Sequence, residues 1–158
     1  MQRKMLQFLL PLMIVAESGM TVHAESIEVP QEVVKISEEL GVQYDICPEL
    51  IQAICWRESR FTEDAVGGAC VGIMQINPKF FRDRMDRLSV TDLYDAKQNM
   101  AVATDYLADL FEKHEDAAAV LMIYHGEHDV ERKMEDGKIS SYASEILEVS
   151  SQLEEKED

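Results

Sequence analysis

The chain has 158 residues and a formal net charge of −16, with 46% apolar and 29% charged residues. This composition is typical of one soluble globular domain with a buried core, and it excludes a disordered chain. Because the negative charge repels nucleic acid and anionic membrane surfaces, neither is an expected partner. An anionic polymer would have to be held by local hydrogen bonds in a groove.

Residues 1–24 are predicted to form a signal peptide. A basic start precedes an apolar run over residues 5–16, and Ala24 closes a small-residue cleavage site. Glu17 ends the run before it reaches the ~20 apolar residues of a membrane span. We therefore expect an exported protein, periplasmic or extracellular, with no membrane span after cleavage. The alternative is an uncleaved anchor.

The remaining chain is predicted to hold one domain over residues 40–150, after a lead-in and first helix over residues 25–39 and before an acidic end over residues 151–158. Most of its pattern is helical. The predicted elements, in chain order, are a helix stopped by Gly41, a helix opened by Pro48, a loop with a short strand or hairpin over residues 62–77, a short helix over residues 80–88, a long helix begun by Asp95, a buried helix over residues 117–124, and a last helix capped by Ser140 or Ser141.

Three cysteines, Cys47, Cys55 and Cys70, leave one unpaired if a disulfide forms. Export permits a disulfide. Cys47 and Cys55 lie about 12 Å apart on one predicted helix, beyond the ~7 Å that a bridge between Cα atoms allows. Any internal bridge must therefore include Cys70, and we favour Cys47–Cys70.

One carboxylate falls on the buried side of a predicted helix. On the helix that Pro48 opens, the inward positions run from Ile51 through Cys55 to Glu58. Loss of solvent disfavours the charged form of a carboxyl group and raises its pKa. Such a group holds a proton near neutral pH and can deliver it as a general acid. The alternative is an acid at the helix end that turns outward or pairs with a neighbouring arginine.

Several separated motifs resemble the soluble lytic transglycosylase family of murein-cleaving, lysozyme-like enzymes. These motifs are Glu58-Ser59-Arg60-Phe61, Asp64-Ala65-Val66 and Gly72-Ile73-Met74-Gln75-Ile76-Asn77-Pro78, followed by Tyr94-Asp95, Asn99, Tyr106-Leu107, Tyr124 near Gly126, and Tyr142. The resemblance covers residues 40–150. Any one motif alone would be weak, but their number and order make the resemblance specific.

The resemblance implies a mainly α, lysozyme-like (α+β) transglycosylase domain with a small β element around a saccharide groove. It implies that Glu58 is the catalytic acid and protonates the glycosidic oxygen between N-acetylmuramic acid and N-acetylglucosamine. The carboxylate would then take a proton from the muramoyl 6-hydroxyl, giving a 1,6-anhydro product. Unlike the usual glycosidase, which has two carboxyl groups, the sequence offers no second acid on a buried stripe. The expected enzyme is a monomer that needs no cofactor and no metal.

The resemblance also suggests a set of substrate-binding residues: Ser59, Gly72, Met74, Gln75, Tyr124, His125 and Tyr142. Each has a structural alternative. The serine could simply end the helix, the glycine could form a turn, the glutamine could belong to the core, and the tyrosines could be buried against backbone carbonyls.

His125 departs from the family pattern, which has an asparagine after the tyrosine. A neutral imidazole partly imitates the donor and acceptor of an amide, so activity is expected, and His125→Asn should preserve or raise it. A charged His125 near Glu58 would lower the pKa of that carboxyl. His125, His128 and Asp129 are too few for a metal site.

Two other functions remain open. One is a lysozyme-type muramidase, which has the same site but cleaves with water. The other is a non-catalytic murein-binding or assembly protein of an envelope-spanning secretion or conjugation machine.

Overall fold

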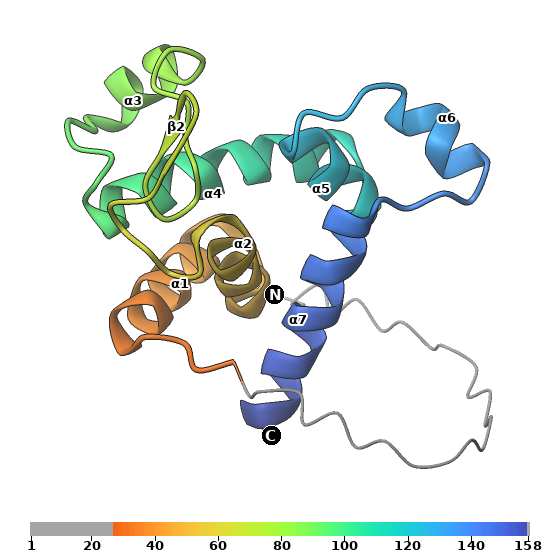
Figure 1. Cartoon of the computed structure of the whole chain (residues 1–158), viewed down its shortest axis with the longest axis horizontal. Helices are drawn as coiled ribbons and strands as arrows, with labels where there is room; N and C mark the ends of the chain where they lie inside the picture. The colour runs from red at the N-terminus through yellow and green to blue at the C-terminus, as the bar shows by residue number, and fades with distance from the viewer. Residues whose placement is uncertain (1–26, 158) are drawn as a thin grey trace.

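A computed structural model describes residues 27–157, so the predicted signal peptide lies outside the described part of the chain. Within this part the predicted fold class is confirmed: the chain is mainly helical with one two-stranded hairpin (Figure 1). The elements are α1 (Gln31–Tyr44), α2 (Pro48–Ser59), β1 (Val66–Gly67), β2 (Cys70–Val71), α3 (Arg82–Leu88), α4 (Ala96–Lys113), α5 (Ala117–Tyr124), α6 (Val130–Glu135) and α7 (Ser141–Glu157).

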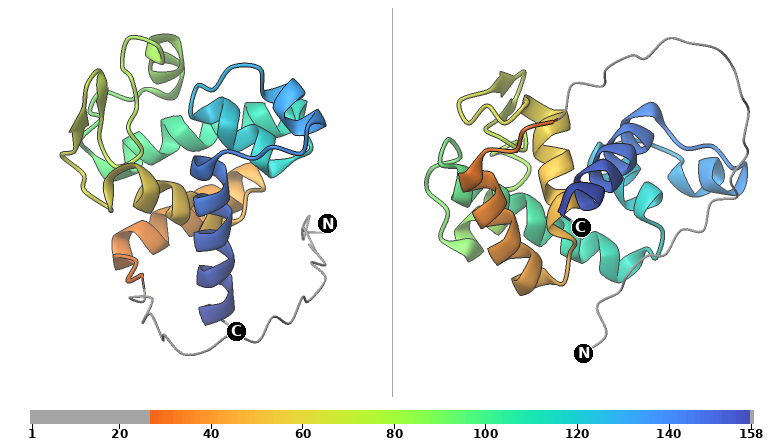
Figure 2. Two further views of the ribbon diagram at one scale, coloured as in Figure 1. Left: turned by 45° about the vertical axis from the view of Figure 1, so that its right-hand side comes forward. Right: turned by 90° about the horizontal axis from the view of Figure 1, so that it is seen from below.

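Helix α2 lies at the centre of the fold. It packs against α1 on one side and α7 on the other, while α4 contacts α1 and α5 (Figures 1 and 2). Its inward residues Ile51, Ile54 and Cys55 have no exposed surface. Burial of such side chains stabilises the fold by about 1.5–3 kcal/mol each. The neighbours on both sides fix the direction in which the last turn of α2 projects.

The predicted stop at Gly41 is wrong. Helix α1 continues to Tyr44 and ends where Asp45 adopts a left-handed conformation with φ of 56°. A Cβ atom on Gly41 would lie 2.7 Å from the carbonyl oxygen of Ile46 and 2.9 Å from Cγ of Pro48. The glycine therefore allows the close approach of α1 and α2 instead of ending α1.

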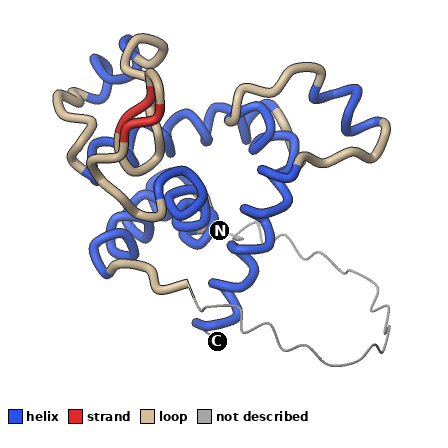
Figure 3. Tube along the Cα trace, in the orientation of Figure 1, coloured by secondary structure: helices blue, strands red, loops and turns tan. Residues whose placement is uncertain are grey.

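The hairpin and the helix begun by Asp95 follow the prediction. Val66 pairs with Val71 and Gly67 with Cys70 in an antiparallel register, shown in red in Figure 3. The Asp95 carboxylate accepts a hydrogen bond from the backbone N–H of Gln98 at 2.8 Å, which caps α4. The side chain of Asn99 in α4 donates to the carbonyl oxygen of Val71 in β2 at 2.9 Å, which holds the hairpin beside the start of α4.

The C-terminal third differs from the prediction in two places. Residues 125–140, which connect α5 to α7, form an arm that carries helix α6 (Figure 1). This helix was not expected. Helix α7 continues to Glu157, so residues 151–157 of the predicted acidic end are helical, and Leu153 in this segment is 6% exposed. None of the helices in residues 27–157 is long and apolar enough to cross a lipid bilayer.

The predicted Cys47–Cys70 disulfide is not formed. All three cysteines are free. Cys47 precedes the first turn of α2, whereas Cys70 lies in β2 near Glu58, at the opposite end of that helix. The helical rise from position 47 to position 58 is about 16 Å. Because Cys70 lies near Glu58, it is too far from Cys47 for a disulfide bridge.

Candidate active site

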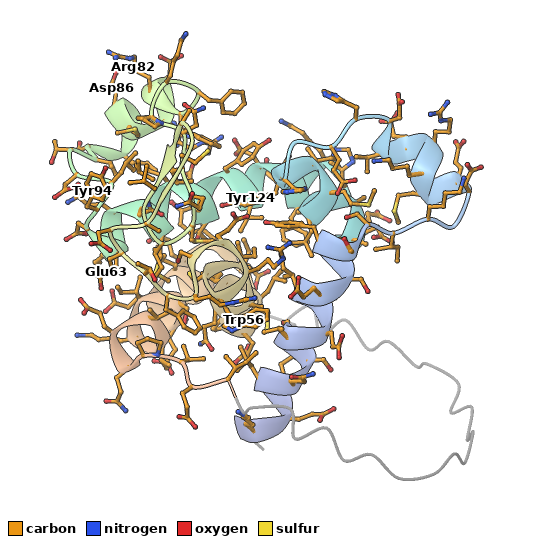
Figure 4. The ribbon with its side chains drawn as sticks, viewed as in Figure 1. Trp56, Glu63, Arg82, Asp86, Tyr94 and Tyr124 are labelled. Atoms are coloured by element: carbon orange, nitrogen blue, oxygen red, sulfur yellow. The ribbon has the colours of Figure 1, made fainter. Side chains whose placement is uncertain are left out.

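A groove with a volume of about 290 Å³ opens at the C-terminal end of α2. It is lined by Glu58, Gly67, Cys70, Gln75, Ile76, Phe81, Tyr124 and His125. Tyr124 comes from the last turn of α5 and is labelled in Figure 4. A second hollow of about 310 Å³, which includes the exposed Phe80 and the half-buried Tyr106, adjoins the first through their shared wall residue Phe81. The two hollows are therefore neighbours on the surface.

Glu58 is half-buried in the last turn of α2. Burial raises the pKa of its carboxyl group. The hydrogen bond that Oη of Tyr142 donates to Oε1 of Glu58 opposes this rise, as do the positive charges of Arg57 and, when it is protonated, His125. The pKa nevertheless stays above that of an ordinary glutamate. Glu58 therefore has the environment of a proton donor, with a partner that stabilises its charged form.

The ring of Tyr142 contacts two side chains. It is 3% exposed, and the imidazole of His125 stacks on its ring with centroids 4.0 Å apart and an interplanar angle of 9°. Cζ of Arg57 lies 5.3 Å from the centre of the same ring. The guanidinium of Arg57 is fixed by Glu145, with Nε 2.6 Å from Oε2. These contacts fix the hydroxyl that points at Glu58.

Ser59 lies behind the groove and not in its wall. Its hydroxyl donates to the carbonyl oxygen of Ile73 at 2.8 Å and accepts from the backbone N–H of Thr62 at 3.0 Å. The single hydroxyl proton is therefore used inside the protein. Ser59 ties the end of α2 to the loop after the hairpin, which supports the position of Glu58.

Gly72 and Met74 also lie outside the groove wall. The side chain of Met74 has no exposed surface. A Cβ atom on Gly72 would lie 2.0 Å from Nδ2 of Asn99 and 2.2 Å from the carbonyl oxygen of Leu93. The motif that contains these residues thus combines supporting positions with groove positions.

Gln75 does line the groove, in a left-handed conformation with φ of 52°. Its side-chain amide donates to the carbonyl oxygen of Gly72 at 2.9 Å and to that of Ala65 at 3.3 Å. Gly67 lets it lie close to the hairpin, because a Cβ there would be 2.3 Å from Oε1 of Gln75.

Tyr124 lines the groove and is hydrogen-bonded to the loop that follows the hairpin. Its hydroxyl donates to the carbonyl oxygen of Met74 at 3.0 Å. Its ring lies 5.9 Å from that of Tyr106, which lies 5.1 Å from Phe81. This row of aromatic rings runs from one hollow to the other, and Phe81 was not singled out from the sequence.

The most connected supporting residue, Asn99, was matched to the family motif but given no role. Its Oδ1 accepts from the backbone N–H of Met74 at 2.9 Å, and its Nδ2 donates to the carbonyl oxygens of Val71 at 2.9 Å and Leu93 at 2.8 Å. Asn99 is fully buried, and a buried amide must find hydrogen-bond partners. The sequence signal that could have indicated this role is an amide next to the apolar Met100 in the first turn of the helix.

A mainly helical domain with a hairpin, and a half-buried carboxyl group in a groove, are the features of a lysozyme-like protein. A family model described as the transglycosylase SLT domain matches residues 35–144, more than half of the chain. The chain therefore belongs to the SLT transglycosylase family, whose members act on cell-wall peptidoglycan. A comparison with curated proteins gave no significant match.

Proposed function

We propose that this protein is a peptidoglycan lytic transglycosylase that cleaves the β-1,4 bond between N-acetylmuramic acid and N-acetylglucosamine and leaves a 1,6-anhydro-muramoyl end. The observation that carries the proposal is Glu58, a carboxyl group with a raised pKa in the wall of the groove. Family membership supports the substrate class. The second hollow beside the first supports a polymeric substrate, since it offers further surface for neighbouring sugar units.

In this mechanism Glu58 transfers its proton to the glycosidic oxygen, and the bond from that oxygen to C1 of the muramoyl residue breaks. Tyr142 then stabilises the new carboxylate through the hydrogen bond that it already donates. The muramoyl 6-hydroxyl bonds to C1 and gives its proton to the Glu58 carboxylate, which restores the acid. Tyr124 and Gln75 shape the wall of the groove around this centre.

Product analysis tests the proposal. Purified protein is incubated with sacculi, and the released fragments are identified by mass spectrometry. We expect anhydro-muramoyl ends, and fragments that are all heavier by one water would contradict the proposal. Sacculus binding without release of fragments would favour the assembly protein instead.

The role of Glu58 is tested with Glu58→Gln, which keeps the shape of the side chain but has no proton to give. We expect a fall in kcat of at least about 100-fold with retained folding, the range that general acid catalysis supplies. Glu63→Gln is the matched control, because Glu63 is an exposed acid five residues further along the chain (labelled in Figure 4). Equal activity of the Glu58→Gln variant and the wild type would refute the assignment.

Export remains part of the proposal, as do the monomeric state and any partner machinery. A substrate in the cell wall requires that the protein leave the cytoplasm, and residues 1–24 have the pattern of a signal peptide. N-terminal sequencing of the protein recovered from the cell envelope should begin at Glu25. An intact Met1 would contradict cleavage.

A further inference from the structure

A second group capable of accepting a proton lines the same groove as Glu58. His125 follows the last turn of α5, and its side chain is 48% exposed. Bulk water therefore reaches the imidazole, whereas Glu58 is half-buried. The two side chains are connected through Tyr142, which stacks on the imidazole and donates to the carboxyl group.

A carboxylate lies beside one nitrogen of His125. Nδ1 lies 3.6 Å from Oε1 of Glu127, a side chain that is only 15% exposed and whose Oε2 is 2.8 Å from Nζ of Lys133. Burial raises the pKa of the Glu127 carboxyl, but the hydrogen bonds from Lys133 and Ser140 outweigh it and bring the pKa below the ordinary value. Glu127 is therefore ionised at neutral pH.

A carboxylate beside Nδ1 favours the neutral tautomer that carries its proton on Nδ1, which leaves the lone pair on Nε2. Within residues 27–157, Nε2 has no hydrogen-bond partner. A histidine with a carboxylate beside one nitrogen and with its other nitrogen open to solvent resembles the arrangement that activates an attacking hydroxyl in other enzymes. Because the imidazole is half exposed, water can reach it.

We propose that His125 is a second catalytic base that activates water, so that a share of the cleavages made by this enzyme ends in hydrolysis. The inference rests on the proposed function, because Glu58 remains the acid that breaks the glycosidic bond. It adds a second product: a reducing muramoyl end beside the anhydro end.

After Glu58 has protonated the leaving oxygen and the bond to C1 has broken, the oxygen of a water molecule bonds to C1. One proton of that water passes to Nε2 of His125, and the other stays on the new C1 hydroxyl. The imidazolium releases its proton to solvent, and the Glu58 carboxylate takes one up. Each cleavage of this kind consumes one water.

The amide expected from the family motif at this position cannot accept a proton in this way, because the neutral amide oxygen is a very weak base. The Glu58 carboxylate would then have to serve as the base for either nucleophile, the muramoyl 6-hydroxyl or water. Replacement of the amide by His125 therefore changes the choice between two nucleophiles. This consequence could not be drawn from the motif, which suggested only an imitation of the amide.

The test measures the ratio of reducing to anhydro ends released from sacculi, with the background from Glu58→Gln subtracted. We expect reducing ends from the wild type, a share at least about 10-fold smaller in His125→Asn, and an unchanged share in the control His128→Asn, an exposed histidine of the same arm. Glu127→Gln should lower the share by a smaller factor. The ratio is informative because a purely structural role would lower both products together.

A wild-type digest that contains anhydro ends alone would overturn the inference and leave the proposed function intact, and so would an equal share in His125→Asn. If His125→Asn does not fold, an unchanged share in Glu127→Gln overturns it. A digest without any fragment that depends on Glu58 refutes the proposed function itself.

Discussion

Glu58 owes its chemistry to residues that are remote in the sequence. The helical repeat of α2 places it next to the core, and this much follows from the spacing of Ile51, Cys55 and Glu58. Its hydrogen-bond partner Tyr142 is 84 positions away. The balance between burial, which raises the pKa of Glu58, and this donor, which lowers it, decides the pH range in which the acid is protonated.

Removal of that donor should change the pH dependence in a definite direction. In Tyr142→Phe the charged form of Glu58 loses a hydrogen bond, so its pKa rises further and the basic limb of the profile of kcat/KM moves to higher pH. The carboxylate formed during catalysis is also less stable, and a hydrogen bond to a charged group is worth about 1.5–3 kcal/mol. We therefore expect a roughly 10- to 100-fold lower kcat. A basic limb that moves to lower pH would contradict this account.

Individual site residues were predictable to different degrees. Glu58, Gln75 and Tyr124 line the groove, as the motifs indicated. Met74 and Gly72 are packed inside because a short motif contains both groove residues and the residues that support them. No local pattern points to Phe81, since only the tertiary packing of the segment before α3 against Tyr106 brings it to the groove.

At the level of the elements, the hairpin is attached to α4 by polar contacts. Asn99 connects three backbone groups of the loop and the helix entry, and Gly72 fits against it without a side chain. The helices were largely predictable from their periodicity and caps. Helix α6 was not, because its six residues include only two apolar side chains and make no repeating stripe.

The contact at Gly72 gives a prediction with an internal control. Gly72→Ala adds a Cβ atom that overlaps the Asn99 amide and the carbonyl oxygen of Leu93, at a φ of 80°. Gly68→Ala has a similar φ of 63° but open space around the new atom. The left-handed conformation costs about 1–2 kcal/mol in both variants, and the overlap should cost Gly72→Ala at least about 2 kcal/mol more. Urea unfolding measures both values, and equal losses would show that the hairpin can move away from α4.

At the level of the whole molecule, the acid in the groove should lower the stability of the fold at neutral pH. The folded state holds the Glu58 proton more tightly than the unfolded chain does, because burial raises the pKa. The free energy of unfolding therefore falls as the pH rises from the ordinary glutamate pKa of 4.5 through the raised value. Within the pH window between these two values the free energy of unfolding of the wild type falls, whereas that of a variant with a neutral side chain at position 58 should not fall for this reason.

Glu58→Gln should accordingly be more stable than the wild type above that window, and the difference should shrink as the pH falls below it. Urea unfolding of both proteins at about pH 4 and about pH 8 measures the difference. Glu63→Gln, which changes an exposed acid, should show no such gap. A Glu58→Gln variant that is less stable than the wild type at the higher pH would contradict this prediction, because the ionised carboxylate would then stabilise the fold.

The pairing of Tyr142 with Glu58 also makes the proposed site depend on the docking of helix α7. A chain truncated before Ser141 would carry Glu58 without the tyrosine that donates a hydrogen bond to it. If the proposed function is right, such a truncated chain should have little activity. The site is complete only when α7 packs against α2.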